Sequence, residues 1–132
     1  MTNLIELRQR IGKILLTWSI ANIMVGAILF LGLPGSILGG VGLQAIIWGL
    51  IDAFIERYVI AKQKEESVEK IASTVRRSIG MDIVFQVVGI LVILSFLQDL
   101  YMVGNGMGVI IQGFFLLLLD SYYYNALRKL KN

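Results

Sequence analysis

The chain has 132 residues and a formal net charge of +3, with 57% hydrophobic and only 16% charged residues. Soluble domains usually contain about 45–50% apolar and about 25% charged residues, so this composition indicates a membrane protein rather than a soluble domain. Cysteine and histidine are both absent, which excludes disulfides, thiolate chemistry and histidine-based metal or acid–base sites. We therefore expect no catalytic residue, no metal site and no cofactor.

Apolar stretches of membrane-spanning length dominate the chain. They run from about Ile11 to Leu33, Ile37 to Ile60, Ile79 to Leu97 and Val103 to Tyr124. A helix needs about 20 apolar residues to cross about 30 Å of hydrocarbon, where backbone groups find no water to bond. The sequence predicts an all-α bundle of four transmembrane helices that forms a single membrane domain over residues 1–132.

The placement of the basic residues predicts the orientation of the spans. The connections Gly32–Ser36 and Gln98–Gly104 contain no lysine or arginine, and turn-forming residues occur in the first and in Gly104-Asn105-Gly106 at the end of the second. Because lysine and arginine favour the cytoplasmic side of short loops, we expect both termini in the cytoplasm and anionic headgroups beside them. The basic residues, all at the opposite ends of the spans, are Arg8, Arg10, Lys13, Arg57, Lys62, Lys64, Lys70, Arg76, Arg77, Arg128, Lys129 and Lys131.

The longer connection, residues 62–78, carries Val68, Ile71 and Val75 at helical spacing among charged residues. This pattern predicts a cytoplasmic amphipathic helix lying against the inner leaflet, or equally a solvated linker helix. It would join two helical hairpins, residues 1–61 and 79–132.

The two hairpins align when the chain is shifted by 68 residues, which places Asp52 on Asp120 and Gln44 on Gln112. Each hairpin contains two spans, so both would enter the membrane in the same orientation. We therefore expect parallel repeats about an axis along the membrane normal.

Polar side chains inside the spans are the candidate functional site, because an ionisable residue there is costly. Gln44, Trp48 and Asp52 share one face of the second helix, as Gln112 and Asp120 do on the fourth. If the repeat brings the two carboxylates together, both cannot stay ionised cheaply, so one would hold a proton. The pair could relay protons or bind a cation. Alternatively, each aspartate is simply protonated, hydrogen-bonded or extended toward the headgroups.

Asn22, with Trp18 and Gly26 one turn away on either side, forms a matching stripe on the first helix, and Asp82 and Gln86 begin one on the third. These stripes would complete a polar core or hold the helices together through amide hydrogen bonds.

A stripe of small residues lies beside the polar face of the second helix. It predicts close helix contact, either within the bundle or between protomers. Nucleic-acid binding is not expected, because no soluble domain presents a groove. The stripe consists of Gly42, Ala45, Gly49 and Ala53.

Several short motifs resemble a known family. They are Arg8-x-Arg10-x-Gly12, then Trp18 and Asn22, then Gln44-x-x-x-Trp48-Gly49-x-x-Asp52, and Gly106-x-Gly108-x-x-x-Gln112-Gly113-x-x-x-x-x-x-Asp120. Over nearly the whole chain this arrangement resembles a family of small four-span prokaryotic membrane proteins classified as a domain of unknown function. Lys13 departs from the pattern, since an apolar residue is expected there. The resemblance implies a four-helix protein of a prokaryotic plasma membrane and supplies no activity.

Three classes of function fit these observations. We expect a non-enzymatic accessory protein that forms a homo-oligomer or joins a larger membrane complex. The alternative is a homo-oligomeric small transporter or channel that uses Asp52 and Asp120 for proton or cation coupling. A membrane enzyme acting on lipids fits least, because no recognisable catalytic set is present. Aspartates that face a wet cavity rather than a dry helix contact would favour the transporter.

Overall fold

A computed structural model describes residues 3–131, apart from the side chains of Lys64 and Lys131. Over this range the chain has no strand and forms four long helices. Each of them contains a stretch long and apolar enough to cross a membrane, which confirms the predicted all-α bundle and indicates a membrane protein. The elements are α1 (Leu4–Gly32), α2 (Ile37–Phe54), the π-helical η1 (Ile55–Ile60), the short 3-10 helix η2 (Ala61–Glu65), α3 (Val68–Ser95) and α4 (Leu100–Lys131).

Each long helix begins beside a short polar side chain that caps it. Asn3 accepts a hydrogen bond from a first-turn backbone N–H of α1 at 2.9 Å, and Ser36 does the same for α2 at 3.0 Å. Ser67 and Asp99 cap α3 and α4, both at 3.2 Å. Because the first N–H groups of a helix have no partner within it, these caps define where each helix begins.

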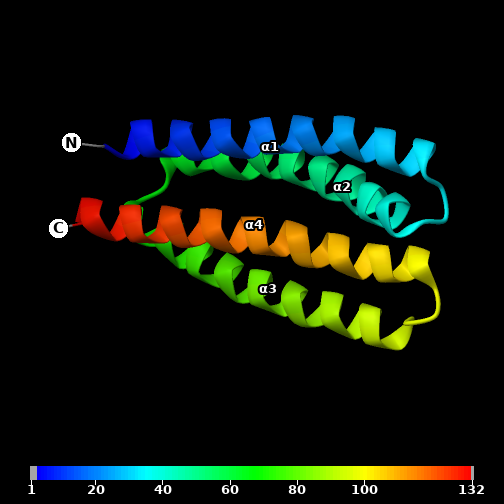
Figure 1. Ribbon diagram of the computed structural model, residues 1–132. Helices are drawn as coiled ribbons and strands as arrows, with labels where there is room; N and C mark the ends of the chain where they lie inside the picture. Colours follow the sequence, from blue (N-terminus) through cyan, green and yellow to red (C-terminus); the bar gives the residue numbers. More distant parts are fainter. Residues whose placement is uncertain (1–2, 132) are drawn as a thin grey trace.

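The bundle consists of two antiparallel hairpins, α1 with α2 and α3 with α4, which lie side by side (Figure 1). The hairpins meet mainly through α2 and α4, so these two helices are the inner pair and run parallel to each other. Both termini and the α2–α3 connection lie at one end of the bundle, and the two hairpin turns lie at the other.

Glycines allow the helices to approach closely at each of these contacts. A Cβ added at Gly42 would lie 2.7 Å from the carbonyl oxygen of Gly26, between α1 and α2. One added at Gly106 would lie 2.8 Å from the carbonyl oxygen of Gly89, between α3 and α4. A Cβ at Gly40 would overlap the backbone of α4. In lipid, where hydrophobic burial does not drive helix association, such close backbone contact is a main source of packing energy.

The apolar core lies toward the end that carries the termini. Tyr123 of α4 is among its most buried members, and its hydroxyl donates a 2.8 Å hydrogen bond to the side-chain oxygen of Gln63 in η2. This bond ties the α2–α3 connection to α4. The core consists of Leu7, Ile11, Leu15, Trp48, Ile60, Ile71, Val75, Leu116, Leu119, Tyr123 and Leu127.

The connection predicted as a separate helix over residues 62–78 has different bounds in the structure. Its first residues form η2, and the rest belong to α3, which continues from Val68 through the third span without a break. The predicted apolar face is helical, but Ile71 and Val75 are buried in the core of the bundle. Since that face packs against the other helices, this segment forms the first turns of α3 and is not a separate helix.

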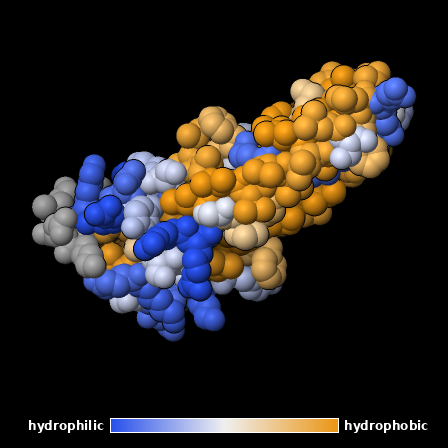
Figure 2. Space-filling view, turned by 90° about the horizontal axis from the view of Figure 1, so that it is seen from below, coloured by the Kyte–Doolittle hydropathy of each residue, from blue (hydrophilic) through white to orange (hydrophobic). Residues whose placement is uncertain are grey.

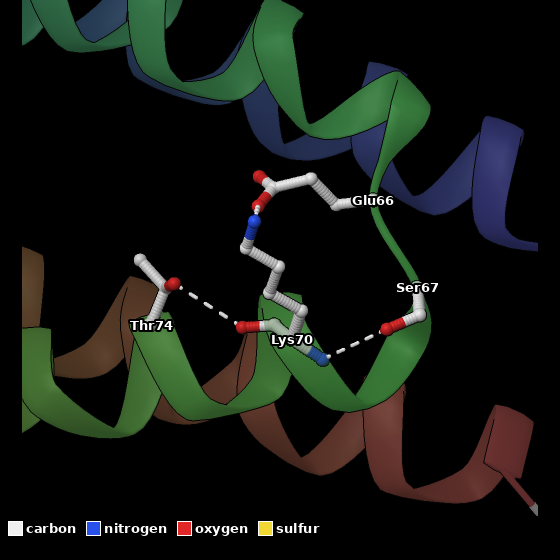
Figure 3. Close-up of polar contacts among 4 residues, drawn as sticks. All are labelled: Glu66, Ser67, Lys70 and Thr74. Carbon is white, nitrogen blue, oxygen red and sulfur yellow. Dashed lines mark hydrogen bonds and ion pairs between the residues drawn. The ribbon is translucent and has the colours of Figure 1, made fainter.

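Polar contacts fix the point at which α3 begins (Figure 3). The ammonium group of Lys70 lies 3.2 Å from a carboxylate oxygen of Glu66, and the backbone N–H of Lys70 bonds the hydroxyl of Ser67. One turn later, the hydroxyl of Thr74 donates to the carbonyl oxygen of Lys70 at 3.1 Å. These contacts turn the chain from η2 into α3.

Hydrophilic residues gather at the end with the termini, and apolar side chains cover most of the remaining surface in view (Figure 2). Large apolar side chains are exposed along the outer helices, such as Ile28 and Leu31 of α1 and Leu94 of α3. A soluble monomer rarely exposes such extended apolar surface, whereas lipid would cover it.

Candidate functional site

A hydrogen-bonded polar group links α4 to α1 in the interior. The side-chain N–H of Gln112 donates to the side-chain oxygen of Asn22 at 2.5 Å, and the indole N–H of Trp18 donates to the side-chain oxygen of Gln112 at 3.1 Å. Asn22 also donates to the carbonyl oxygen of Trp18 at 2.7 Å. The indole ring stacks on Phe115 at 4.0 Å between centroids. Gln112 therefore holds the second hairpin against the first.

A second polar group links α2 to α4. Gln44 accepts a 3.1 Å hydrogen bond from the indole N–H of Trp48 and donates one of 2.8 Å to the side-chain oxygen of Asn105. Asn105 in turn donates to the carbonyl oxygen of Tyr101 at 3.0 Å. The predicted amide face of α2 is thus satisfied by neighbouring side chains and serves to join the inner helices.

Asp52 lies one turn beyond Trp48 on the same face of α2 and is 0% exposed. Neither of its carboxylate oxygens has a hydrogen-bond partner among the described residues. It lies close enough to Asp120 of α4 for a direct interaction between the two charges. The structure therefore brings the two predicted aspartates into proximity, with Asp52 in a dry position.

Asp120 makes its closest polar contact with a different residue, Asp82 of α3. The two carboxyl groups lie within hydrogen-bonding reach of each other, and such a bond requires a proton on one of them. Asp82 is 3% exposed, and its second oxygen has no partner within the described part of the chain. Three aspartates, one each from α2, α3 and α4, therefore converge at the same depth.

The Asp82–Asp120 pair lines a cavity of about 540 Å³ that is bounded by all four long helices and by η1 and η2. Most of its wall is apolar or aromatic, with contributions from Trp48, Phe85 and Leu116. Its polar lining toward the terminal end includes Gln63, Thr74, Arg77, Ser78 and Tyr123. The pair therefore borders an open space, whereas Asp52 does not line it.

The small-residue stripe of α2 is used within the chain. Gly42 contacts Gly26, and Gly49 lies against Ile23 and Ser19 of α1, with the hydroxyl of Ser19 donating to the carbonyl oxygen of Gly49 at 2.6 Å. Ala45 is buried, and a Cβ at Gly26 would lie 2.9 Å from its side chain. Ala53, the last member of the stripe, is only partly buried. Of the two alternatives drawn from the sequence, the structure places Gly42, Ala45 and Gly49 in the α1–α2 contact.

The structure places two further polar side chains beside those predicted for the site, Asp82 and Asn105. Asp82 was assigned only to a stripe on the third helix, although its acidic type within a span gave the same signal as Asp52. Asn105 lies within α4, whereas the sequence predicted a turn at Gly104-Asn105-Gly106, and no pattern in the sequence pointed to Gln44 as its partner. Over residues 3–131, no group of three acidic side chains is arranged to hold a metal ion.

Comparison with known proteins gives one match. Residues 14–121 match the model of DUF6992, described as a family of unknown function, which confirms the expected membership in a family of unknown function. No curated protein matches the chain, and no solved structure matches it.

Proposed function

The chain belongs to DUF6992, a family of unknown function, and from the geometry of its site we propose that it moves protons or cations across a membrane. The groups that bind them are the carboxyls of Asp82 and Asp120, with Asp52 nearby to influence their charge. The sequence raised transport as the alternative to an accessory role. We prefer transport because a cavity lies beside Asp82 and Asp120.

The observation that carries the proposal is the unpartnered oxygen of Asp82 beside a cavity. Buried polar atoms in native proteins almost always have a hydrogen-bond partner, so an orphan atom needs an explanation. A proton shared between Asp82 and Asp120 stabilises one oxygen of each carboxyl and leaves the second oxygen of Asp82 without a protein partner at the wall of the cavity. Intramembrane carboxyls with this access are typical of ion and proton pathways.

The proposal includes a location and an orientation. The chain would lie in the plasma membrane of a prokaryote, with the terminal end of the bundle in the cytoplasm. The clustering of basic residues at that end supports this orientation. Reporter fusions at Asn132 and in the Gly32–Ser36 turn check it: alkaline phosphatase activity is expected from the turn fusion alone, and activity from the C-terminal fusion would reverse the orientation.

We propose a non-enzymatic homo-oligomer, because four helices are too few to enclose a wide pathway and the chain contains no histidine or cysteine nucleophile. The parallel inner helices α2 and α4 and the proximity of Asp52 to Asp120 also support two parallel repeats. Cross-linking of the protein in native membranes tests the oligomer, and a monomer at all cross-linker concentrations would contradict it. An experimental structure in which the two hairpins do not superpose would contradict the repeat.

The function is tested by flux in liposomes that contain the purified protein. We expect proton or cation flux above that of empty liposomes, lost in Asp82→Asn and Asp120→Asn. Asp99→Asn is the matched control: Asp99 lies at the hairpin turn far from the cavity, and asparagine caps a helix as well as aspartate does. Loss of flux in the control as well, or no flux from the folded wild type, would refute the proposal.

The accessory role remains the second candidate, supported by the exposed apolar faces of α1 and α3, which a larger membrane complex would cover. The use of Gly42 and Gly49 inside the chain takes away one argument for it. Co-purification of a defined membrane complex with the tagged protein, together with absent flux, is the result expected from this role. A flux-competent protein that purifies alone would exclude it.

A further inference from the structure

The cavity beside the carboxyl pair has the size and lining of a small-molecule site. Its volume of about 540 Å³ falls within the roughly 300–1,000 Å³ of typical ligand pockets. Such sites are mostly apolar with a few polar groups, and here Asp82 and Asp120 are the acidic ones. A bare metal ion or proton would leave most of this apolar space unused.

The aromatic side chains of the cavity favour a cation. Trp48 and Phe85 meet edge to face at 4.8 Å between centroids and both line the space, as does the ring of Tyr123. Aromatic faces attract organic cations, and the attraction increases when water is excluded. Apolar walls with aromatic rings suit a cation whose charge is enclosed by hydrocarbon.

Neither carboxyl group forms an ion pair within the described part of the chain. Arg77 also lines the cavity, but the ion pair found among the described residues joins Lys70 to Glu66. The negative charge that forms when the Asp82–Asp120 pair loses its proton therefore has no ion-pair partner among these residues. A ligand cation would supply the missing charge.

We propose that this cavity binds a lipophilic organic monocation in exchange for the proton held between Asp82 and Asp120. Binding places the cation beside the ionised pair and releases one proton to water; release of the cation restores the proton. The inference rests on the proposed function and names its substrate class.

Competition between the cation and protons makes binding stronger as pH rises. The titratable and charged groups near the pair are Asp52 from α2, Arg77 from α3 and Tyr123 from α4, and Arg8 of α1 and Glu66 lie near Tyr123. The carboxyl groups of the pair exchange the proton, so they determine the pH dependence.

The test uses the purified full-length protein in detergent and two probes of equal shape, tetraphenylphosphonium and tetraphenylborate. We expect saturable quenching of tryptophan fluorescence by the cation, release of about one proton per cation in weakly buffered solution, and no comparable binding of the anion. Asp82→Asn and Asp120→Asn should bind the cation at least about tenfold more weakly, and Asp99→Asn should bind it as the wild type does.

The comparison of the two probes needs no variant, so it decides the question even if the aspartate variants fail to fold. Equal binding of both ions, or binding of the cation without proton release, would overturn the inference. Proton flux in liposomes without saturable cation binding would overturn it and leave the proposed function standing. Cation binding with proton release but without flux would support the site and contradict the transport role.

Discussion

The tightest helix contact in the first hairpin gives a sharp test of the packing. In Gly42→Ala, the new Cβ would lie 2.7 Å from the carbonyl oxygen of Gly26 and 2.8 Å from both the Cβ of Leu29 and the backbone nitrogen of Phe30. Ordinary van der Waals contact begins at 3.4 Å. Moving from 2.7 Å to 3.4 Å requires α1 and α2 to separate by about 0.7 Å.

Two opposing effects determine how much Gly42→Ala changes the free energy of unfolding. Overpacking of this kind costs about 1–3 kcal/mol, while alanine is better than glycine in a helix by about 1 kcal/mol. Gly80→Ala provides the matched control, because a Cβ at Gly80 of α3 meets nothing within 4 Å. Gly80→Ala should therefore be stabilised by the helix preference of alanine, with no steric cost to oppose it. The difference between the two variants then isolates the steric cost, which we expect to be about 1–3 kcal/mol.

Unfolding by SDS in mixed micelles, followed by circular dichroism, measures this difference. We expect Gly42→Ala to unfold at a lower SDS fraction than the wild type and Gly80→Ala at the same or a higher one. If the two variants unfold together, α1 and α2 do not cross where the structure places them, and the reasoning about glycine contacts fails.

The same unfolding assay checks three further predictions. Gln112→Leu removes two side-chain hydrogen bonds to α1 and should cost about 1–2 kcal/mol; an unchanged midpoint would mean that this amide does not join the hairpins. Ser67→Ala removes the cap of α3 and should cost about 1 kcal/mol, whereas Ser73→Ala, exposed on the same helix, should change little. Tyr123→Phe leaves a buried amide oxygen unpaired at a cost of about 1–3 kcal/mol, while Tyr58→Phe, at a side chain that is 58% exposed, should be neutral; equal effects would contradict the buried bond.

The spans and their polar stripes could be predicted from the sequence because both are local properties. Gln44, Trp48 and Asp52 share a face wherever the helix packs, since the helical period alone aligns them. The residues at which the helices begin and end were less predictable. The sequence predicts that the third span begins at Ile79, just after the last basic residues of the connection, but α3 begins at Val68. Burial of Ile71 and Val75 against other helices stabilises the additional turns, and such burial depends on residues distant in the sequence.

The sequence by itself therefore determined how many helices are long and apolar enough to cross a membrane, which end is basic and which side chains are costly to bury, because hydrophobic length and charge act residue by residue. Only the tertiary structure decided which of those side chains meet. Asp120 finds Asp82 because α3 packs against α4, and Gln112 reaches Asn22 because α4 lies against α1. Which side chains come into contact depends on how the glycine-lined faces of the helices pack against each other. The pattern of residues along the sequence does not contain that information.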